Sequence, residues 1–142
     1  MIDVEKLYLE AMKARENSYS PYSNFAVGAC VLTKDGKYIH GANIENSSYP
    51  LSCCAERTCL FTAMNLGYKK DDFVAFALVA DTDEPTSPCG ACRQVISELL
   101  NKNTPIYMFN VKKDMKLTNI EELLPFCFSG DDLKWRLDTS QL

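Results

Sequence analysis

Apolar side chains recur at helical spacing in three stretches of the chain, so three amphipathic helices are predicted. These stretches are residues 3–16, 55–66 and 90–101. The residues expected to face inward are, in chain order, Val4, Leu7, Tyr8, Ala11 and Met12, then Cys59, Leu60, Ala63 and Met64, then Ala91, Val95, Ile96, Leu99 and Leu100. Asp3 can cap the first helix, and Gly67 lies just past the end of the second. A short fourth helix is expected over residues 119–124, stopped by Pro125.

Strands are predicted between these helices, at residues 25–33, 38–43, 73–80 and 104–110. The first two flank a turn with Asp35-Gly36 at its centre, which is typical of a β-hairpin. The third (FVAFALVA) is apolar on both faces, which indicates a buried central strand. A hairpin followed by helix, strand, helix and strand predicts a single α/β domain over residues 1–142 with a mixed sheet. The polar C-terminal tail is expected to be irregular or weakly helical.

Composition and charge favour an ordinary soluble, cytoplasmic protein. Hydrophobic residues make up 46% of the chain and charged residues 24%, as in globular domains. The longest apolar stretch, residues 73–80, is too short to span a bilayer, and the charged N-terminus does not resemble a signal peptide. The net charge is −4, and the lysines lie in small scattered groups. Because binding to a nucleic-acid backbone requires a basic face, neither nucleic acid nor membrane is expected as a partner.

Seven cysteines point to a metal site. Their odd number argues against a disulfide framework. Cys89 and Cys92 are three residues apart, so both would project from the first turn of one helix, while Cys54 would begin another. Helix starts favour thiolates over thiols. If the two helix starts face each other, three thiolates converge on one point and leave a fourth position for water, which is the arrangement of catalytic zinc.

Glu56 and Arg57 follow Cys54 directly and add to this pattern. A carboxylate beside zinc-activated water provides the base that hydrolysis needs, and an arginine can donate hydrogen bonds to ligand sulfurs. The order Cys-x-Glu followed later by Pro-Cys-x-x-Cys is the general signature of zinc-dependent deaminases. The sequence therefore indicates a hydrolytic deaminase centre.

Three other interpretations of the cysteines remain open. Cys53 could join the other three thiols in a structural zinc site, Cys89 and Cys92 could form a redox pair, or all the thiols could be inert core residues. The first leaves Glu56 without a role, and the second leaves Cys54 unused as well. The cysteines expected to be inert are Cys30, Cys53, Cys59 and Cys127. The single histidine, His40, is expected not to be a ligand.

Five segments, in order along nearly the whole chain, resemble the small homotetrameric zinc-dependent cytidine deaminases. They are residues 20–29 (SPYSNFAVGA), 41–50 (GANIENSSYP), 53–61 (CCAERTCLF), 87–99 (SPCGACRQVISEL) and 121–133 (EELLPFCFSGDDL). The resemblance implies a three-layer α/β/α fold with a mixed, mostly five-stranded sheet, and one Zn²⁺ per chain. It also implies deamination of cytidine and 2′-deoxycytidine in pyrimidine salvage, by attack of zinc-activated hydroxide at C4.

The same resemblance implies a role for each matching residue. Cys54, Cys89 and Cys92 would hold the zinc, Glu56 would carry the protons, and Arg57 would neutralise the thiolates. The implied substrate contacts are Phe25 near the base, Ala55 beside it, Asn43 and a buried Glu45 on the ribose, and Tyr49 and Phe128, which reach a neighbouring subunit's pocket in the homotetramer.

Some of these assignments have alternatives. Phe25 and Phe128 would more often be core residues, and Glu45 could be a solvated loop charge. Phe126 and Cys127 stand where relatives have small residues, so it is open which phenylalanine caps the pocket. A deaminase of a cytosine-containing antibiotic nucleoside is an alternative activity. A structural zinc module that binds a partner is an alternative from another class.

Overall fold

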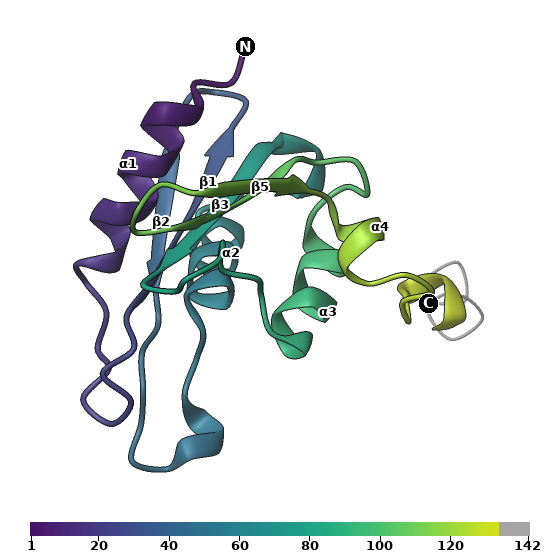
Figure 1. Cartoon of the computed structure of the whole chain (residues 1–142). Coiled ribbons are helices and arrows are strands. Elements are labelled where there is room, and N and C mark those ends of the chain that lie inside the picture. The colour runs from purple at the N-terminus through teal and green to yellow at the C-terminus, as the bar shows by residue number, and fades with distance from the viewer. Residues whose placement is uncertain (134–142) are drawn as a thin grey trace.

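A five-stranded sheet in the order β2-β1-β3-β4-β5 forms the centre of the protein in the computed structural model, which describes residues 1–133 (Figure 1). The strands are β1 Val27–Thr33, β2 Tyr38–Ala42, β3 Phe73–Ala80, β4 Ile106–Asn110 and β5 Met115–Thr118. Only β3 and β4 run parallel, and the other neighbouring pairs are antiparallel. The predicted mixed five-stranded sheet is therefore confirmed. The prediction for the polar tail falls on residues 134–142, outside the described residues.

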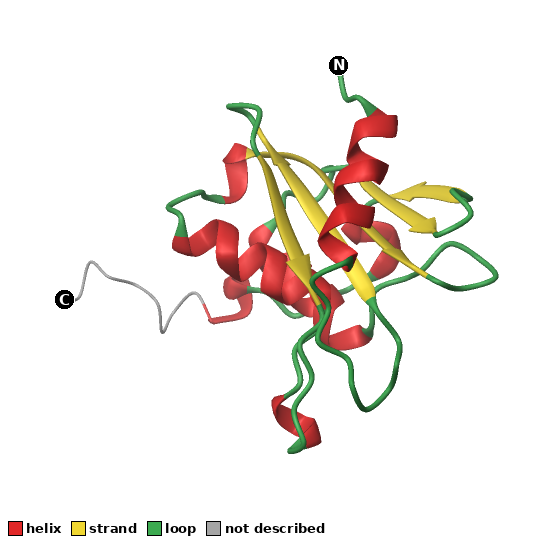
Figure 2. Ribbon diagram, turned by 90° about the vertical axis from the view of Figure 1, so that its left-hand side faces the viewer, coloured by secondary structure: helices red, strands yellow, loops and turns green. Residues whose placement is uncertain are grey.

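Helices cover both faces of this sheet (Figure 2). They are α1 Val4–Arg15, α2 Ala55–Asn65, α3 Gly90–Leu99 and α4 Ile120–Leu123, with 3₁₀ turns η1 Tyr49–Leu51, η2 Lys70–Asp72 and η3 Gly130–Leu133. Leu7, Tyr8 and Ala11 of α1 pack with Val79 and Phe109 on one face. α2, α3 and α4 share a second core on the other face. The three-layer α/β/α fold is thus confirmed.

The structure corrects several details of the sequence prediction. Met64 and Ala91 were expected to face inward, but both are exposed. Only a narrow stripe of α2, formed by Ala55, Cys59, Leu60 and Ala63, reaches the sheet, and Ala91 lies in the first turn of α3, outside its packed face. Strand β5 was not predicted, because three of its four residues are exposed at the sheet edge.

Strand β1 also begins two residues later than expected, at Val27. Asn24 takes a left-handed backbone conformation (φ 56°), and the chain enters the strand only after this turn. Phe25 therefore belongs to a loop and not to the strand that was predicted for it.

Close contact between α2 and β2 fixes the position of the first turn of α2. A Cβ atom on Gly41 would lie 2.3 Å from the Cys59 nitrogen and 2.5 Å from the Ala55 oxygen, so only glycine allows this approach. The hydroxyl of Thr58 also donates to the Ala42 carbonyl at 2.8 Å. The start of α2 is thereby held against the sheet.

Two loops extend side by side beyond the sheet, residues 17–26 and 43–53 (Figure 1). The Tyr19 nitrogen donates to the Asn43 carbonyl at 2.9 Å, and the Glu45 nitrogen donates to the Tyr19 carbonyl at 2.8 Å. Ile44 and Cys53 exchange two backbone hydrogen bonds, at 2.9 and 2.8 Å. The second loop therefore returns along itself and delivers the chain to Cys54.

Candidate active site

Two helix starts meet on the same face of the sheet. Cys54 is the N-cap residue of α2 and Cys89 is the N-cap residue of α3, both with extended backbones. N-cap side chains often bond to the helix backbone, but neither thiol does so. Their sulfurs are therefore available to face each other, and Cys92 lies in the first turn of α3 with its side chain fully buried.

The three sulfurs form a cluster with the dimensions of a metal site. The Sγ atoms of Cys54, Cys89 and Cys92 all lie within 4.8 Å of one another, and this is the only such group of His, Cys, Asp and Glu in residues 1–133. A tetrahedral ion with metal–sulfur bonds of about 2.3 Å needs sulfurs about 3.8 Å apart. Cys54 and Cys89 are separated by 3.8 Å. The cluster therefore fits a zinc ion with three protein ligands.

Arg57 lies against this cluster. Its Nη2 atom donates to the Cys54 sulfur at 3.6 Å. Its Nε atom is buried without a hydrogen-bond partner. A buried donor atom on a cationic group is stabilised by neighbouring negative charge, which three thiolates would supply.

The pKa values of the Cys54 and Cys92 thiols shift in opposite directions. Hydrogen bonds from Cys92, Arg57 and Cys89 lower the pKa of Cys54 to about 5, against the opposing effect of burial. The pKa of Cys92 moves the opposite way, because its thiol is the partner in the bond to Cys54 and is buried. A lowered pKa favours the thiolate form of Cys54, which is the form that binds a metal ion.

Glu56 occupies the first turn of α2 beside the sulfurs, and only 4% of its surface is exposed. Burial raises the pKa of its carboxyl to about 7, and the negative charge of Cys54 adds to this effect. A carboxyl group of this kind can both accept and donate a proton near neutral pH.

Most of the hydrogen-bonding groups of the Asn43 side chain are used within the protein. Its Oδ1 atom accepts from the Ser18 hydroxyl at 2.5 Å and the Val27 nitrogen at 2.9 Å, and its Nδ2 atom donates to the Phe25 carbonyl at 2.7 Å. A side-chain amide has two N–H donors. One donor of Asn43 therefore remains for a ligand.

Glu45 is a loop-anchored carboxylate, and this corrects the expectation that it is buried. It is half-buried, and it accepts hydrogen bonds from the backbone of Tyr22 and Ser23, at 3.0 and 3.1 Å, and from the Ser23 hydroxyl. These bonds hold the pKa of Glu45 below its usual value. Glu45 is therefore also not the freely solvated loop charge of the alternative interpretation.

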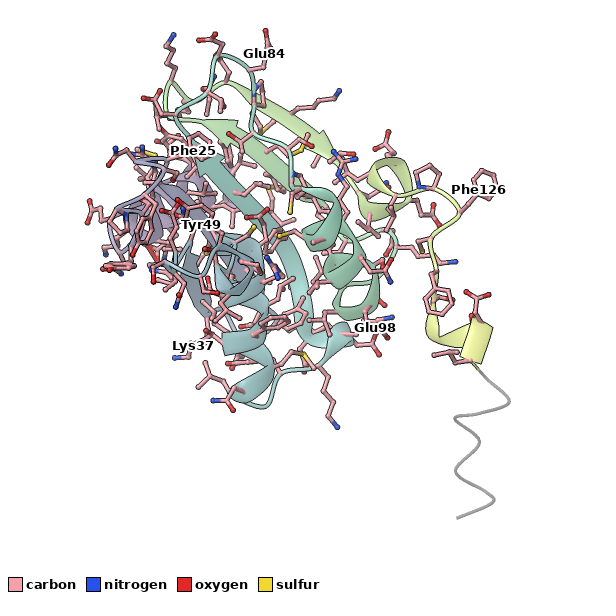
Figure 3. All side chains as sticks on the ribbon, turned by 90° about the horizontal axis from the view of Figure 1, so that it is seen from below. Phe25, Lys37, Tyr49, Glu84, Glu98 and Phe126 are labelled. Carbon is pink, nitrogen blue, oxygen red and sulfur yellow. The ribbon has the colours of Figure 1, made fainter. Side chains whose placement is uncertain are left out.

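A surface pocket of about 310 Å³ lies against this carboxylate, and its lining residues are Tyr22, Ser23, Glu45, Tyr49 and Ser52. The rings of Tyr22 and Tyr49 meet edge to face, with centroids 6.0 Å apart. Figure 3 shows Phe25 on the same side of the molecule as Tyr49, and Phe126 at the opposite end. Ala55 is buried at the start of α2.

The aromatic residues with core alternatives are exposed. Phe25 is 42% exposed and Phe128 is 58% exposed, so the core interpretation of both is wrong. Phe126 is completely exposed and has a left-handed backbone (φ 56°). Large apolar side chains that face solvent in a single chain are typical of surfaces that bind a ligand or another subunit.

The remaining cysteines and the histidine lie outside the cluster. Cys30 and Cys59 are buried, Cys53 and Cys127 are half-buried, and all seven cysteines are free. His40 is on β2, where its Nε2 atom lies 3.6 Å from Glu10 of α1.

Comparison with known proteins agrees with this geometry. Residues 1–108 match the family model described as the cytidine and deoxycytidylate deaminase zinc-binding region. The chain belongs to this family. It is 52% identical to the cytidine deaminase of Sporosarcina psychrophila, over 94% of this chain and 97% of the relative. It is 51% identical to that of Halalkalibacterium halodurans, over 93% and 98%.

Solved structures of the family share the fold. The crystal structure of cytidine deaminase from Burkholderia pseudomallei superposes with a TM-score of 0.87 at 47% identity, covering 90% of this chain and all of the other. The Mycobacterium tuberculosis enzyme superposes with a TM-score of 0.76 at 34% identity, covering 90% and 98%. The family resemblance and the α/β fold expected from the sequence are therefore confirmed.

Because the family model describes a zinc-binding region, family membership identifies zinc as the metal of the cysteine cluster. The protein is a zinc-dependent deaminase with one site per chain. In the described part of the chain, no helix is long and apolar enough to cross a membrane.

Sequence reasoning missed the serines that hold the substrate loops. Ser18 fixes the Asn43 amide, and Ser23 anchors Glu45. Both serines lie in the loop at residues 17–26, and the polar composition of this loop gives no signal of which carboxylate or amide each serine meets.

Proposed function

We propose that this protein hydrolyses cytidine and 2′-deoxycytidine to uridine and 2′-deoxyuridine with release of ammonia, as a cytoplasmic step of pyrimidine salvage. The observation that carries the proposal is a buried Glu56 carboxyl beside three converging cysteine sulfurs. The names of the relatives, which are cytidine deaminases, support the same substrate class.

In this proposal Cys54, Cys89 and Cys92 hold the zinc, and Arg57 offsets the charge of their thiolates. Zinc bound there supplies the Lewis acidity that makes a water molecule nucleophilic near neutral pH. Each turnover adds one water to C4 of cytosine and releases one ammonia. The residues of the chain must therefore bind the nucleoside, orient C4 and move protons between the water, the ring and the leaving amine.

Glu56 moves these protons. Its carboxylate first accepts a proton from the attacking water and delivers it to N3, which makes C4 electrophilic. The carboxylate then accepts the proton of the hydroxyl now at C4 and transfers it to the amine, so that the C4–N bond breaks, ammonia leaves and the C4 carbonyl forms. A pKa near 7 suits this alternation, because both protonation states are accessible.

The proposed substrate contacts come from the two loops and the aromatic residues. The free N–H of Asn43 and the carboxylate of Glu45 bind the ribose hydroxyls, while Phe25 and the buried Ala55 lie against the base. An ionised Glu45 also repels a 5′-phosphate, which favours free nucleosides over nucleotides and polynucleotides.

Pockets completed by neighbouring subunits of a homotetramer are also part of the proposal. Tyr49 is 71% exposed and Phe128 is 58% exposed, so most of each side chain is left uncovered by its own chain. Both are available to reach the pocket of a second copy, as the family resemblance implies.

The alternative interpretations account for less of the structure. A structural zinc module gives no role to a buried carboxyl at the cluster, and a Cys89–Cys92 redox pair leaves both Glu56 and Arg57 unexplained. The antibiotic-nucleoside deaminase shares the metal motif, but none of the relatives described above carries that name.

The substrate assignment is tested by measuring kcat/KM for cytidine, deoxycytidine, cytosine and CMP side by side, from the ultraviolet absorbance change. We expect cytidine and deoxycytidine to be similar, cytosine to be weak, and CMP to be at least about a hundredfold poorer, because a like-charge contact costs several kcal/mol.

Glu45→Gln serves as the matched variant. It removes the charge but keeps an oxygen that can accept from the backbone nitrogens of Tyr22 and Ser23, and it should narrow the difference in kcat/KM between cytidine and CMP. Equal rates for CMP and cytidine in the unmodified protein would contradict the proposed role of Glu45. A zinc-loaded protein that does not deaminate cytidine would contradict the proposed function.

A further inference from the structure

The side chain of Arg93, the residue after Cys92, connects two distant parts of the chain. Its Nε atom donates to the Pro88 carbonyl at 2.8 Å, and its Nη2 atom donates to the Ser87 hydroxyl at 2.5 Å. Its Nη1 atom donates to the Leu123 carbonyl at 2.7 Å. Ser87 and Pro88 lead directly into Cys89, whereas Leu123 is the last residue of α4.

Gln94 extends this connection by one residue. Its Nε2 atom donates to the Phe128 carbonyl at 3.0 Å. Two successive side chains of α3 therefore hold both ends of residues 123–128, which we call the C-terminal segment. This segment carries Phe126 and Phe128 and extends away from the body of the molecule in Figure 1.

The chemistry of these contacts favours arginine specifically. The last carbonyls of a helix have no partner within the helix, and a positive charge there is favourable. The planar guanidinium presents several donors in a fixed arrangement, so one side chain serves three acceptors at once. A lysine ammonium has a different geometry and cannot reproduce all three bonds.

We propose that Arg93 is a positioning residue that fixes the Ser87–Pro88 approach to Cys89 and the C-terminal segment as one unit, with Gln94 holding the distal end of that segment. Two consequences follow. Arg93 slows zinc loss by holding the backbone that presents the Cys89 sulfur. Together with Gln94, it sets the position from which the aromatic side chains of the segment reach substrate. Only this second consequence rests on the proposed function.

The experiment compares Arg93→Lys, Gln94→Ala, their combination and Ser97→Ala in the zinc-loaded, full-length protein. Among the described residues 1–133, the Ser97 hydroxyl bonds only to the Gln94 carbonyl of its own helix, so this variant is the control for the loss of a local hydrogen bond on α3. Two quantities are measured for each: the rate of zinc transfer to an excess of the colorimetric chelator 4-(2-pyridylazo)resorcinol, and kcat and KM for cytidine.

Arg93→Lys should release zinc about tenfold faster, which is the lower end of the effect of losing residues that orient metal ligands, and should raise KM. Gln94→Ala should raise KM several-fold with zinc release and kcat within about twofold of the unmodified protein. The KM effects of the two substitutions should be non-additive in the combined variant, because both act on one segment. Ser97→Ala should change nothing. If the two side chains had only a structural role, Arg93→Lys and Gln94→Ala would both lower stability and kcat. Zinc release would then not separate the two variants.

Zinc release and KM of Arg93→Lys both within twofold of the unmodified protein would overturn the proposal. If that variant does not fold, Ser87→Ala, which removes one acceptor of the guanidinium, takes its place and should still accelerate zinc release. Unchanged release there would also overturn it. An unmodified protein that binds zinc but does not deaminate cytidine would refute the proposed function, while the zinc-release comparison would still decide the role of Arg93.

Discussion

Single residues decide whether the sulfur cluster is a catalytic or a structural metal site. Cys53 adjoins Cys54 in sequence, yet it is not one of the three residues whose sulfurs lie within 4.8 Å of one another. The buried group beside the sulfurs is instead the Glu56 carboxyl. Three sulfurs leave one coordination position open, and that position is what distinguishes a hydrolytic zinc site from a closed one.

Replacing individual cysteines tests this distinction. Cys89→Ala and Cys92→Ala each remove one of three ligands, so elemental analysis should show zinc falling from about one per chain to a small fraction. Cys53→Ala is the matched control and should keep its zinc. Zinc loss from Cys53→Ala as well would favour the structural four-cysteine site. Full retention in Cys89→Ala and Cys92→Ala would remove both residues from the ligand set.

At the same scale, the sequence predicted the residues with distinctive chemistry and missed those that support them. Cys54, Glu56 and the Cys89–Cys92 pair have a fixed spacing because they share helix turns, and this spacing is visible in the sequence. The hydrogen bonds from Ser18 to Asn43, from Ser23 to Glu45 and from Arg93 to Leu123 join residues that are 22 to 30 positions apart. No local pattern encodes those contacts, because they form only when the loops and α4 are in place.

At the scale of elements, the position of the catalytic residues depends on the contact between α2 and β2. Gly41→Ala would place a Cβ atom against the backbone of α2, and backbone cannot move aside as a flexible side chain can. We expect the free energy of unfolding to fall by about 3 kcal/mol, the upper end of the usual cost of overpacking. Chemical denaturation measures this directly.

Gly130→Ala is the control for that substitution, because a Cβ atom there meets nothing within 4 Å. Its free energy of unfolding should stay within about 0.5 kcal/mol of the unmodified protein. A Gly41→Ala variant as stable as Gly130→Ala would show that α2 does not need this close approach to the sheet.

Elements with strong patterns were predicted well, and elements that depend on their surroundings were not. The apolar β3 and the amphipathic α1, α2 and α3 were placed within a few residues of their observed bounds. Strand β5 was missed because it is an edge strand of only four residues, three of them exposed, and so short an apolar/polar alternation gives only a weak signal. The predicted inward orientation of Met64 and Ala91 was wrong, because periodicity does not show how much of a helix surface the sheet will cover.

On the scale of the whole molecule, the single chain leaves several large apolar side chains exposed to solvent. They include Tyr49, Leu51, Phe61, Leu66, Phe126 and Phe128, each at least 48% exposed. Figure 3 shows Phe126 at the opposite end of the molecule from Phe25 and Tyr49, so Phe126 does not lie over the pocket beside Glu45 in its own chain. These features support assembly with pockets completed by another copy.

Light scattering on the active protein tests this assembly. The molar mass from light scattering should equal that of four copies of the 16.0 kDa chain, and this mass should not fall on dilution to assay concentrations. Phe128→Ala should raise KM for cytidine several-fold, and Phe126→Ala, the other exposed phenylalanine of the segment, is the comparison that shows which of the two caps the pocket. A monomer with full activity would contradict the assembly and the role of Phe128.

The central claim is that Glu56 moves protons at a zinc site held by three cysteines. It is tested most directly by the turnover of Glu56→Gln at matched zinc content, because glutamine keeps the shape and hydrogen bonding of the side chain but cannot carry the proton. The account predicts about one zinc per chain in both proteins, with kcat lower in the variant by about a thousandfold or more. Near-normal cytidine turnover in a fully zinc-loaded Glu56→Gln protein would contradict it.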